Sequence, residues 1–279
     1  MPRAYPYAQV DVFSEDAFGG NPVAVILDAG DLSAEQMQRI ARWTNLSETT
    51  FLLPSSDPAA DYRARIFTPH SELPFAGHPT LGSARAWLHY GGQPQVPGEV
   101  TQECTAGLIR VRAEQSTLSF AAPPTLRSGP LEEELLVRIA AAFSIERAQI
   151  LDHQWVDNGP GWAVVQLASA SNVLALEPHV EALAGTKVGA IGAYPTGSAA
   201  SFEIRAFTPH GPALEDPITG SLNAGVAQWM IRTGKAQASY YVAQGQRLGR
   251  TGRIEISSED GITWVGGRTA IGFEGVARL

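Results

Sequence analysis

The chain has 279 residues, of which 44% are hydrophobic and 17% charged, with a formal net charge of -8. This composition is typical of a globular protein, and the acidic balance argues against a nucleic-acid partner. The single cysteine, Cys104, excludes a disulfide framework, a cysteine-based zinc site and two-thiol chemistry. Because there is neither a signal-peptide pattern nor a run of about 18 apolar residues, we expect a cytoplasmic location and no membrane partner.

The first half is predicted to contain short strands and two helices. Alternating apolar residues and turn signals predict strands over residues 7–13, 23–27, 46–53, 62–67, 101–105, 108–113 and 117–121. A capping box formed by Ser33 and Gln36 begins the first helix. The apolar face of this helix is expected to bury Met37, Ile40 and Ala41 with Trp43 or Thr44. The second helix is expected to begin after His78, with Pro79 at its first position.

The second half repeats this order after a boundary rich in proline, glycine and serine at residues 123–130. We therefore expect two domains, residues 1–126 and 127–279. The elements predicted in the second domain are a helix over 132–143, a strand over 162–167, a helix near 173–183, a strand over 202–207, and β-like pieces at 240–243, 253–256 and 263–265. Asp216 and Pro217 are expected to open a further helix, with Asp216 as its N-cap.

An internal repeat links the two halves. Residues 67–87 read FTPHSELPFAGHPTLGSARAW, and residues 207–229 read FTPHGPALEDPITGSLNAGVAQW. A second match, GNPVAVIL at 20–27 with GPGWAVVQL at 159–167, has nearly the same separation along the chain. Two matches at one separation predict two domains of the same architecture. We expect a pseudo-twofold relation that brings His78 and Asp216 face to face, in an α+β fold with sheets wrapped around one helix per half.

Three titratable residues are candidates for acid–base chemistry. Asp216 before Pro217 has the ordinary interpretation of an N-cap, worth about 1 kcal/mol, and Glu48 that of a solvated charge on a strand. His78 is a poor N-cap, and a pKa of about 6.5 suits proton transfer. Because two helix N-termini with nearby glycine and hydroxyl groups are rich in donors, the pair predicts a site for an anionic substrate.

Other kinds of site have less support in the sequence. His70 and His210 recur in identical Phe-Thr-Pro-His turns, which favours a structural role for both. A metal site made from these two and His78 lacks the close ligand spacing of zinc motifs. No phosphate-binding loop, dinucleotide fingerprint or Gly-x-Ser-x-Gly elbow is present, so we expect no cofactor and no serine-based hydrolysis.

The motifs NLSETTF at 45–51, FTPHSELPFAGHPTLGSA at 67–84 and EDPITGS at 215–221 resemble the PhzF-like phenazine-biosynthesis isomerase family. GNPVAV at 20–25 and DLSAEQMQRIAR at 31–42 fit the same pattern, so the resemblance covers essentially the whole chain. It implies a diaminopimelate-epimerase-like fold of two pseudo-symmetric domains, each wrapping mixed sheet around a central helix. It also implies that the last strand, near 270–279, returns to the first domain, and that the protein is a homodimer.

The resemblance implies a cofactor-free proton shift, as in the isomerisation of trans-2,3-dihydro-3-hydroxyanthranilate. Glu48 resembles the carboxylate that takes a proton from one carbon and returns it to another. His78, Asp216 and Ser221 resemble groups that assist by hydrogen bonding and proton relay. The resemblance further assigns a small carboxylate-bearing substrate to contacts with Ser47, Gly77, Gly220 and Ser221.

The chain departs from related patterns at several positions. Ala76 and Pro217 stand near the places where related epimerases have two cysteines, so a two-thiol epimerase is excluded. Larger residues than usual follow Asp-Pro and Gly-Ser and are expected to alter the pocket floor: Ile218, Leu222 and Asn223. Two alternatives to the isomerase remain, a binding or interaction protein of the same fold and a thiol-free epimerase or racemase.

Overall fold

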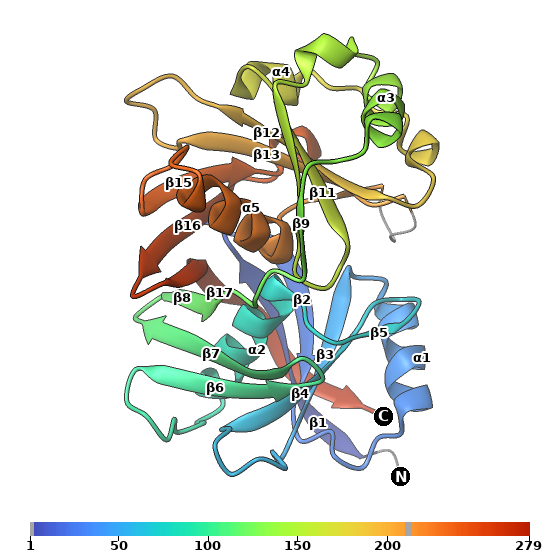
Figure 1. Ribbon diagram of the computed structural model, residues 1–279. Coiled ribbons are helices and arrows are strands. Elements are labelled where there is room, and N and C mark those ends of the chain that lie inside the picture. The colour runs from blue at the N-terminus through green and yellow to red at the C-terminus, as the bar shows by residue number, and fades with distance from the viewer. Residues whose placement is uncertain (1–2, 210–213) are drawn as a thin grey trace. The chain divides into compact units, whose positions relative to one another are not determined.

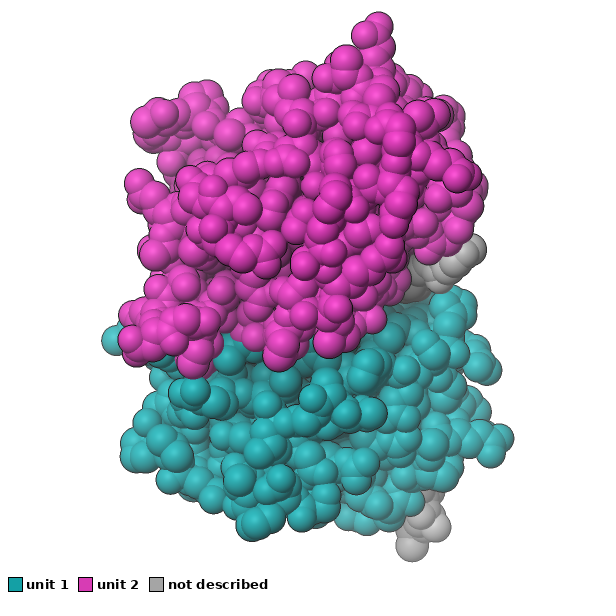
Figure 2. All heavy atoms as spheres, viewed as in Figure 1, with its two compact units in different colours: residues 1–121, 266–279 teal, residues 122–265 magenta. Residues whose placement is uncertain are grey.

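The computed structural model describes residues 3–209 and 214–279 (Figure 1). The chain divides into two compact units, shown in separate colours in Figure 2. Unit 1 is Met1–Ala121 with Gly266–Leu279, and unit 2 is Ala122–Val265. The last strand, β17 (Ile262–Arg278), begins in unit 2 and continues in unit 1. The expected domain limit between residues 126 and 127 stays a prediction.

Unit 1 is a closed β-barrel with two helices, α1 (Ala34–Thr44) and α2 (Gly77–His89). Its strands, besides most of β17, are β1 (Ala4–Val12), β2 (Asn21–Ile26), β3 (Glu48–Leu53), β4 (Tyr62–Phe67), β5 (Glu72–Leu73), β6 (Glu99–Cys104), β7 (Gly107–Glu114) and β8 (Thr117–Ala121). Neighbours pair in the order β1–β2, β2–β3, β3–β4, β4–β6, β6–β7 and β7–β8. Because β17 pairs with both β8 and β1, the sheet closes on itself.

Helix α2 lies inside this barrel, whereas α1 lies outside it (Figure 1). Residues of α2 contact β1, β2, β3, β4, β6 and β8, and most of the helix is buried. Helix α1 packs on β3 and β4 and contributes Met37 and Ala41 to an apolar cluster with Phe51 and Phe67. The central helix is thus surrounded by strands, which suits its apolar sequence.

The sequence predicted most of α1 correctly. Ser33 and Gln36 form the expected capping box, and Met37 and Ala41 are fully buried while Ile40 packs against their cluster. The expectation that Trp43 is buried is wrong, because its side chain is 85% exposed. It lies outside the single buried face of the helix, which contains Met37 and Ala41. Thr44, the alternative, is half-buried and shares a hydrogen bond of 2.7 Å with Thr49.

Unit 2 repeats the pairing pattern of unit 1. Its helices are α3 (Glu133–Ala142), α4 (Ala170–Leu174) and α5 (Gly220–Arg232), with single 3-10 turns at η1 (Arg147–Gln149), η2 (Val180–Leu183) and η3 (Gln246–Leu248). Its strands, besides the start of β17, are β9 (Arg127–Gly129), β10 (Asp152–Asp157), β11 (Trp162–Gln166), β12 (Lys187–Ala193), β13 (Phe202–Phe207), β14 (Glu215–Asp216), β15 (Ser239–Gln244) and β16 (Gly252–Glu259).

The pairings β10–β11, β11–β12, β12–β13, β13–β15 and β15–β16 match those of the first half in order and direction. Short strands β5 and β14 also occupy the same place, each paired with the strand before it. The prediction of two halves with one architecture is therefore confirmed. A continuous helix near residues 173–183 is wrong, because α4 ends at Leu174 and η2 begins at Val180. Pro178, between them, cannot continue a helix.

The central helices α2 and α5 are both 13 residues long and carry glycine at their sixth residue. A Cβ on Gly82 would lie 2.2 Å from Cγ1 of Val23, and a Cβ on Gly225 would lie 2.2 Å from the main-chain oxygen of Val156. Each helix therefore touches its surrounding strands at a point where no side chain fits. Aligned at their first residues, the helices pair His78 with Ser221 and Gly82 with Gly225.

We predict that Gly225→Ala lowers the free energy of unfolding by about 1–3 kcal/mol, although alanine favours an ordinary helix by about 1 kcal/mol. The clash involves main chain, which cannot rotate away, so Gly82→Ala, which meets a side-chain methyl, should cost less. Denaturant unfolding measures both. Gly30→Ala is the control, since its Cβ would lie 3.6 Å from the nearest atom, Cδ of Pro54. A Gly225→Ala protein as stable as the wild type would contradict the close approach.

Candidate functional site

The first cluster of predicted residues lies in unit 1, where β3 begins and α2 begins. Glu48 is the first residue of β3, and His78 is the second residue of α2. Oε2 of Glu48 lies 3.3 Å from Nε2 of His78, and both side chains are largely buried. Nδ1 of His78 lies 3.3 Å from Nδ2 of Asn21, the first residue of β2. The fold thus brings together two of the three predicted acid–base residues.

His78 is held as a neutral imidazole. Desolvation lowers its pKa from 6.5 to about 3, and a main-chain hydrogen bond with Pro22 acts in the opposite direction. Proline has no main-chain N–H, so the ring donates this bond to the main-chain oxygen of Pro22. A protonated ring would attract Glu48, but His78 is only 4% exposed. Desolvation is therefore the larger effect.

Two further predicted residues flank this pair. Ser47 is half-buried in the short turn between α1 and Glu48, and Gly77 is the first residue of α2. Within the described chain, Ala76, the N-cap of α2, makes no side-chain hydrogen bond to the first turn. The positive end of the helix dipole therefore lies beside His78 without a local cap.

The second cluster lies in unit 2, in the segment that leads into α5. Asp216 belongs to the short strand β14, where it pairs with Ala206 of β13. Oδ2 of Asp216 accepts a hydrogen bond of 2.7 Å from the hydroxyl of Thr219. Gln244, at the end of β15, donates from Nε2 to the main-chain oxygen of Asp216 and to the hydroxyl of Thr219, at 3.2 and 3.0 Å. Asp216 is thus fixed through both its main chain and its side chain.

The predicted starts of both central helices need correction. Helix α2 begins at Gly77, two residues before Pro79, and α5 begins at Gly220, with Thr219 as its N-cap. Asp216 is therefore not a helix cap. Pairing with β13 keeps it in extended backbone, and the main-chain N–H of Thr219 bonds to Gln244 before the helix starts. By helix position the counterpart of His78 is Ser221 and not Asp216.

Ser221 is held by two residues of unit 2 that the sequence did not single out. Its hydroxyl oxygen accepts a hydrogen bond of 3.0 Å from Nε1 of Trp162, and its main-chain oxygen accepts one of 2.9 Å from Nδ2 of Asn158. Indole N–H is a donor only, so the hydroxyl proton of Ser221 remains for a different acceptor. Gly220, the other predicted contact, is the buried first residue of α5.

Asn21 and Asn158 have the same task in the two units, because each bonds the second residue of a central helix. The sequence carried a signal for both. Asn21 lies in Gly-Gly-Asn-Pro, where β2 begins, and Asn158 lies in Asn-Gly-Pro-Gly, in the turn between β10 and β11. An asparagine next to glycine and proline usually bonds the backbone of its own turn. The local pattern therefore did not predict a bond to a distant helix.

Ile218 and Leu222, which were expected to alter the pocket floor, pack against glycines of unit 2. Both are fully buried. A Cβ on Gly189 would lie 2.7 Å from Cδ2 of Leu222, and a Cβ on Gly252 would lie 2.7 Å from Cγ1 of Ile218. Glycines on β12 and β16 thus make room for these side chains inside unit 2. Asn223, also buried, donates to Gln244 and to the main-chain oxygen of Thr219.

The sequence also drew attention to His70, His210 and the thiol of Cys104. His70 is exposed in the turn after β4, and His210 lies outside the described residues. Across residues 3–209 and 214–279 no three side chains of His, Cys, Asp or Glu are grouped as a metal site. Burial raises the pKa of the Cys104 thiol, which makes it a poor nucleophile. None of the described helices is long and apolar enough to cross a membrane.

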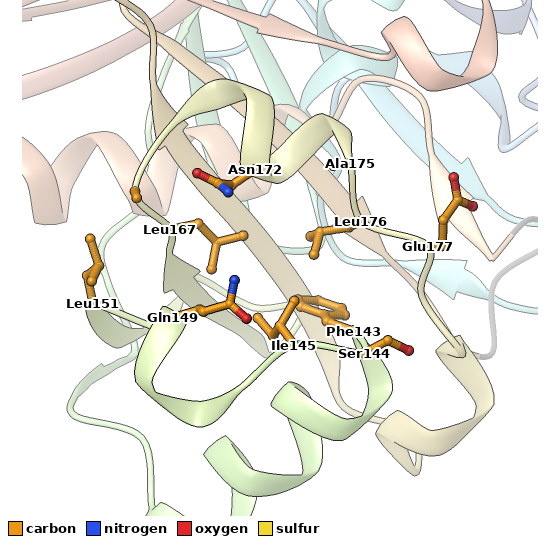
Figure 3. Close-up of a pocket in the computed structure, with 11 residues that line it drawn as sticks. Phe143, Ser144, Ile145, Gln149, Leu151, Leu167, Asn172, Ala175, Leu176 and Glu177 are labelled. Atoms are coloured by element: carbon orange, nitrogen blue, oxygen red, sulfur yellow. The ribbon is translucent and has the colours of Figure 1, made fainter.

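A pocket of about 270 Å³ within unit 2 contains none of the predicted residues (Figure 3). It lies beside the end of α3, the η1 turn and α4. Apolar side chains such as Phe143 and Leu176 line it together with Gln149 and Asn172. Of the described residues that line it, only Glu177 is titratable, and Glu177 is paired with Arg247. The lining therefore does not suit acid–base chemistry.

Comparison with known proteins shows which family has this sequence and fold. The family model PhzC-PhzF, described as phenazine biosynthesis-like protein, matches residues 10–275. Antisense-enhancing sequence 1 of Schizosaccharomyces pombe is 37% identical, with 95% of each chain covered. Trans-2,3-dihydro-3-hydroxyanthranilate isomerase of Pseudomonas chlororaphis is 36% identical over 88% of this chain and 87% of the relative. A crystal structure of a PhzF-family protein from Enterococcus faecalis has a TM-score of 0.81 at 25% identity and covers 99% of this chain and 100% of its own.

Two barrel-like halves of one architecture, together with relatives named as isomerases, define the class of the protein, which is an isomerase. The chain belongs to the phenazine biosynthesis-like family, PhzC-PhzF.

We predict that His78 makes the protein less stable in mild acid. The folded-state pKa is about 3 and the unfolded value 6.5, so between them the unfolded chain binds more protons and stability falls as pH falls. The slope from this one group is at most about 1.4 kcal/mol per pH unit. Denaturant unfolding from pH 7 to 4 should show a shallower loss in His78→Gln than in the wild type.

His70→Gln is the control for this experiment, because His70 is exposed and its replacement should leave the slope unchanged. If His78 were instead held in its charged form by Glu48, the wild type would gain stability relative to His78→Gln as pH falls. That result would reverse the protonation state described above.

Proposed function

We propose that this isomerase moves a proton between two carbons of a small carboxylate-bearing substrate without a cofactor, in a reaction similar to that of trans-2,3-dihydro-3-hydroxyanthranilate isomerase. The observation that carries the proposal is the buried pair in unit 1, with Oε2 of Glu48 at 3.3 Å from Nε2 of a neutral His78. A carboxylate beside a neutral imidazole can accept a proton, because the neutral ring does not form an ion pair with it.

Glu48 is the proposed base. Its carboxylate takes the proton from one carbon, so that the C–H electron pair enters the conjugated system of the substrate. The same carboxyl group then returns the proton to another carbon of that system. Bonds broken and formed are C–H and O–H in each step, so the substrate is neither oxidised nor reduced. With the ring diene that the related enzyme converts, the enol formed by the proton shift tautomerises to a ketone.

His78 and Ser221 are proposed to assist as hydrogen-bond donors. Nε2 of the neutral His78 ring lies 3.3 Å from Glu48, so the ring can orient this carboxylate or relay a proton. The hydroxyl oxygen of Ser221 accepts a hydrogen bond from Trp162, so the hydroxyl proton of Ser221 points to another acceptor. This supports a role for Ser221 as a donor to an anionic substrate. Ser47, Gly77 and Gly220 are proposed substrate contacts through hydroxyl and main-chain N–H groups.

Asp216 is the third proposed acid–base group. It is half-buried and already accepts a hydrogen bond from the hydroxyl of Thr219, which supports an ionised carboxylate.

The location and assembly of the protein belong to the same proposal. The lone buried thiol fits a cytoplasmic protein, and the family resemblance supports a homodimer, which light scattering of the purified protein tests directly.

We predict that Glu48→Gln lowers turnover by about 10²- to 10⁴-fold, the usual contribution of a general base, while ligand affinity changes little. Glutamine keeps the size and the polar contacts of the side chain but cannot take up the proton. The measurement is deuterium incorporation from D2O into trans-2,3-dihydro-3-hydroxyanthranilate, followed by NMR with product formation.

Thr49→Ser is the control at the neighbouring position, since it keeps the hydroxyl that bonds Thr44. Exchange at the wild-type rate in Glu48→Gln would show that Glu48 is not the base and would reassign the proton transfer to His78 or Asp216. Exchange in the wild type on a panel of amino acids, with none on the ring substrate, would favour the thiol-free racemase. Binding without any exchange would favour the binding protein.

A further inference from the structure

The side-chain amide of Gln244 uses all four of its hydrogen-bonding positions inside unit 2. Oε1 accepts from the main-chain N–H of Thr219 at 3.0 Å and from Nδ2 of Asn223 at 2.9 Å. Nε2 donates to the main-chain oxygen of Asp216 at 3.2 Å and to the hydroxyl of Thr219 at 3.0 Å. The residue is 1% exposed. A fully satisfied buried amide has a single orientation, because turning it would place donors against donors.

This orientation determines where the hydroxyl proton of Thr219 points. A hydroxyl group has one proton and two lone pairs, and one lone pair accepts from Nε2 of Gln244. The proton is therefore free for the other neighbour, Oδ2 of Asp216, at 2.7 Å. Such a distance is typical of a hydroxyl that donates to a carboxylate. The three residues form a chain of donors that runs from Gln244 through Thr219 to Asp216.

Helix capping does not account for the Thr219 hydroxyl. Thr219 occupies the N-cap position of α5, yet within the described residues its side chain makes no capping hydrogen bond to the helix. Its hydroxyl instead faces backward along the chain, toward Asp216. A threonine at an N-cap normally gives its oxygen to the first turn. Here the oxygen accepts from a strand residue and the proton serves a carboxylate.

Unit 1 contains a similar arrangement with a different end point. Gln102 on β6 is fully buried, donates from Nε2 to the hydroxyl of Thr80 at 3.0 Å, and accepts from the hydroxyl of Tyr62. Thr80 then donates to the main-chain oxygen of Ala76 at 2.9 Å. Gln102 and Gln244 lie on equivalent strands, β6 and β15, each parallel to the strand that leads toward the central helix. Only the unit 2 chain ends on an ionisable side chain.

We infer that Gln244 and Thr219 are positioning residues for the reaction, which hold the Asp216 carboxylate in one rotamer through the hydroxyl proton of Thr219. The inference rests on the proposed function, in which Asp216 takes part in proton relay. A directed donor to one oxygen helps to fix the whole carboxylate, and such preorganisation raises turnover more than it raises substrate affinity.

Thr219→Val tests the inference, because valine keeps the shape of threonine and removes only the hydroxyl. We expect kcat on trans-2,3-dihydro-3-hydroxyanthranilate to fall about 10- to 100-fold, as for a lost hydrogen bond to a charged group, with KM within about threefold. Thr219→Ser should restore kcat to within about threefold of the wild type. Gln244→Glu should resemble Thr219→Val, since an ionised carboxylate only accepts and draws the hydroxyl proton away from Asp216.

Thr80→Val is the control in unit 1, because it removes a buried hydroxyl that accepts from a strand glutamine, Gln102, and donates to main chain instead of to a carboxylate. Both valine variants should lower the thermal midpoint, but only Thr219→Val should lower kcat by tenfold or more. Equal kcat losses in the two variants, or no rescue by Thr219→Ser, would overturn the positioning role and leave a structural one.

Asp216→Asn separates this inference from the proposed function. A slow Asp216→Asn enzyme together with a Thr219→Val enzyme at the wild-type rate would overturn the positioning role and leave the role of Asp216 intact. An Asp216→Asn enzyme at the wild-type rate would overturn both. A wild-type protein without activity on the ring substrate would overturn the proposed substrate and, with it, this inference.

Discussion

A helix enclosed by strands has its first turn inside the protein, where an unpaired polar group is costly. In both units the N-cap side chain leaves that turn without a local bond, so the surrounding strands and turns supply the polar partners. Asn21 and Asn158 hold the second residue of each central helix, and Gln102 and Gln244 hold a nearby threonine. Satisfying the helix start therefore places well-ordered polar side chains where the proposed chemistry occurs.

The same architecture supports different chemistry in the two units. At the second residue of the central helix, unit 1 has His78 and unit 2 has Ser221. Equivalent positions of the repeat therefore carry a titratable ring in one unit and a simple hydroxyl in the other. Unit 2 has its carboxylate in the segment before the helix, whereas unit 1 has Glu48 on a neighbouring strand. The two units thus share one frame but carry different polar residues at the start of the central helix.

Local patterns in the sequence predicted the frame well and the helix starts poorly. The repeat, the strands and the capping box of α1 depend on short-range periodicity, which a single sequence displays. Asp216 looked like an N-cap because Asp-Pro is a strong local signal, but pairing with Ala206 overrides it. Trp43 was misplaced for a similar reason, since apolar character does not show which face of a helix is covered. The buried glutamines gave no signal, because Gln102 and Gln244 acquire their partners only through strand pairing.

The protonation of His78 connects the fold to the proposed mechanism. A charged imidazole at 3.3 Å would form an ion pair with Glu48 and make its carboxylate a weaker base. Burial inside the barrel opposes that charge and lowers the pKa of His78 to about 3, which favours the neutral ring. The barrel therefore does more than support α2. It also keeps His78 buried and neutral beside Glu48, as the proposed mechanism requires.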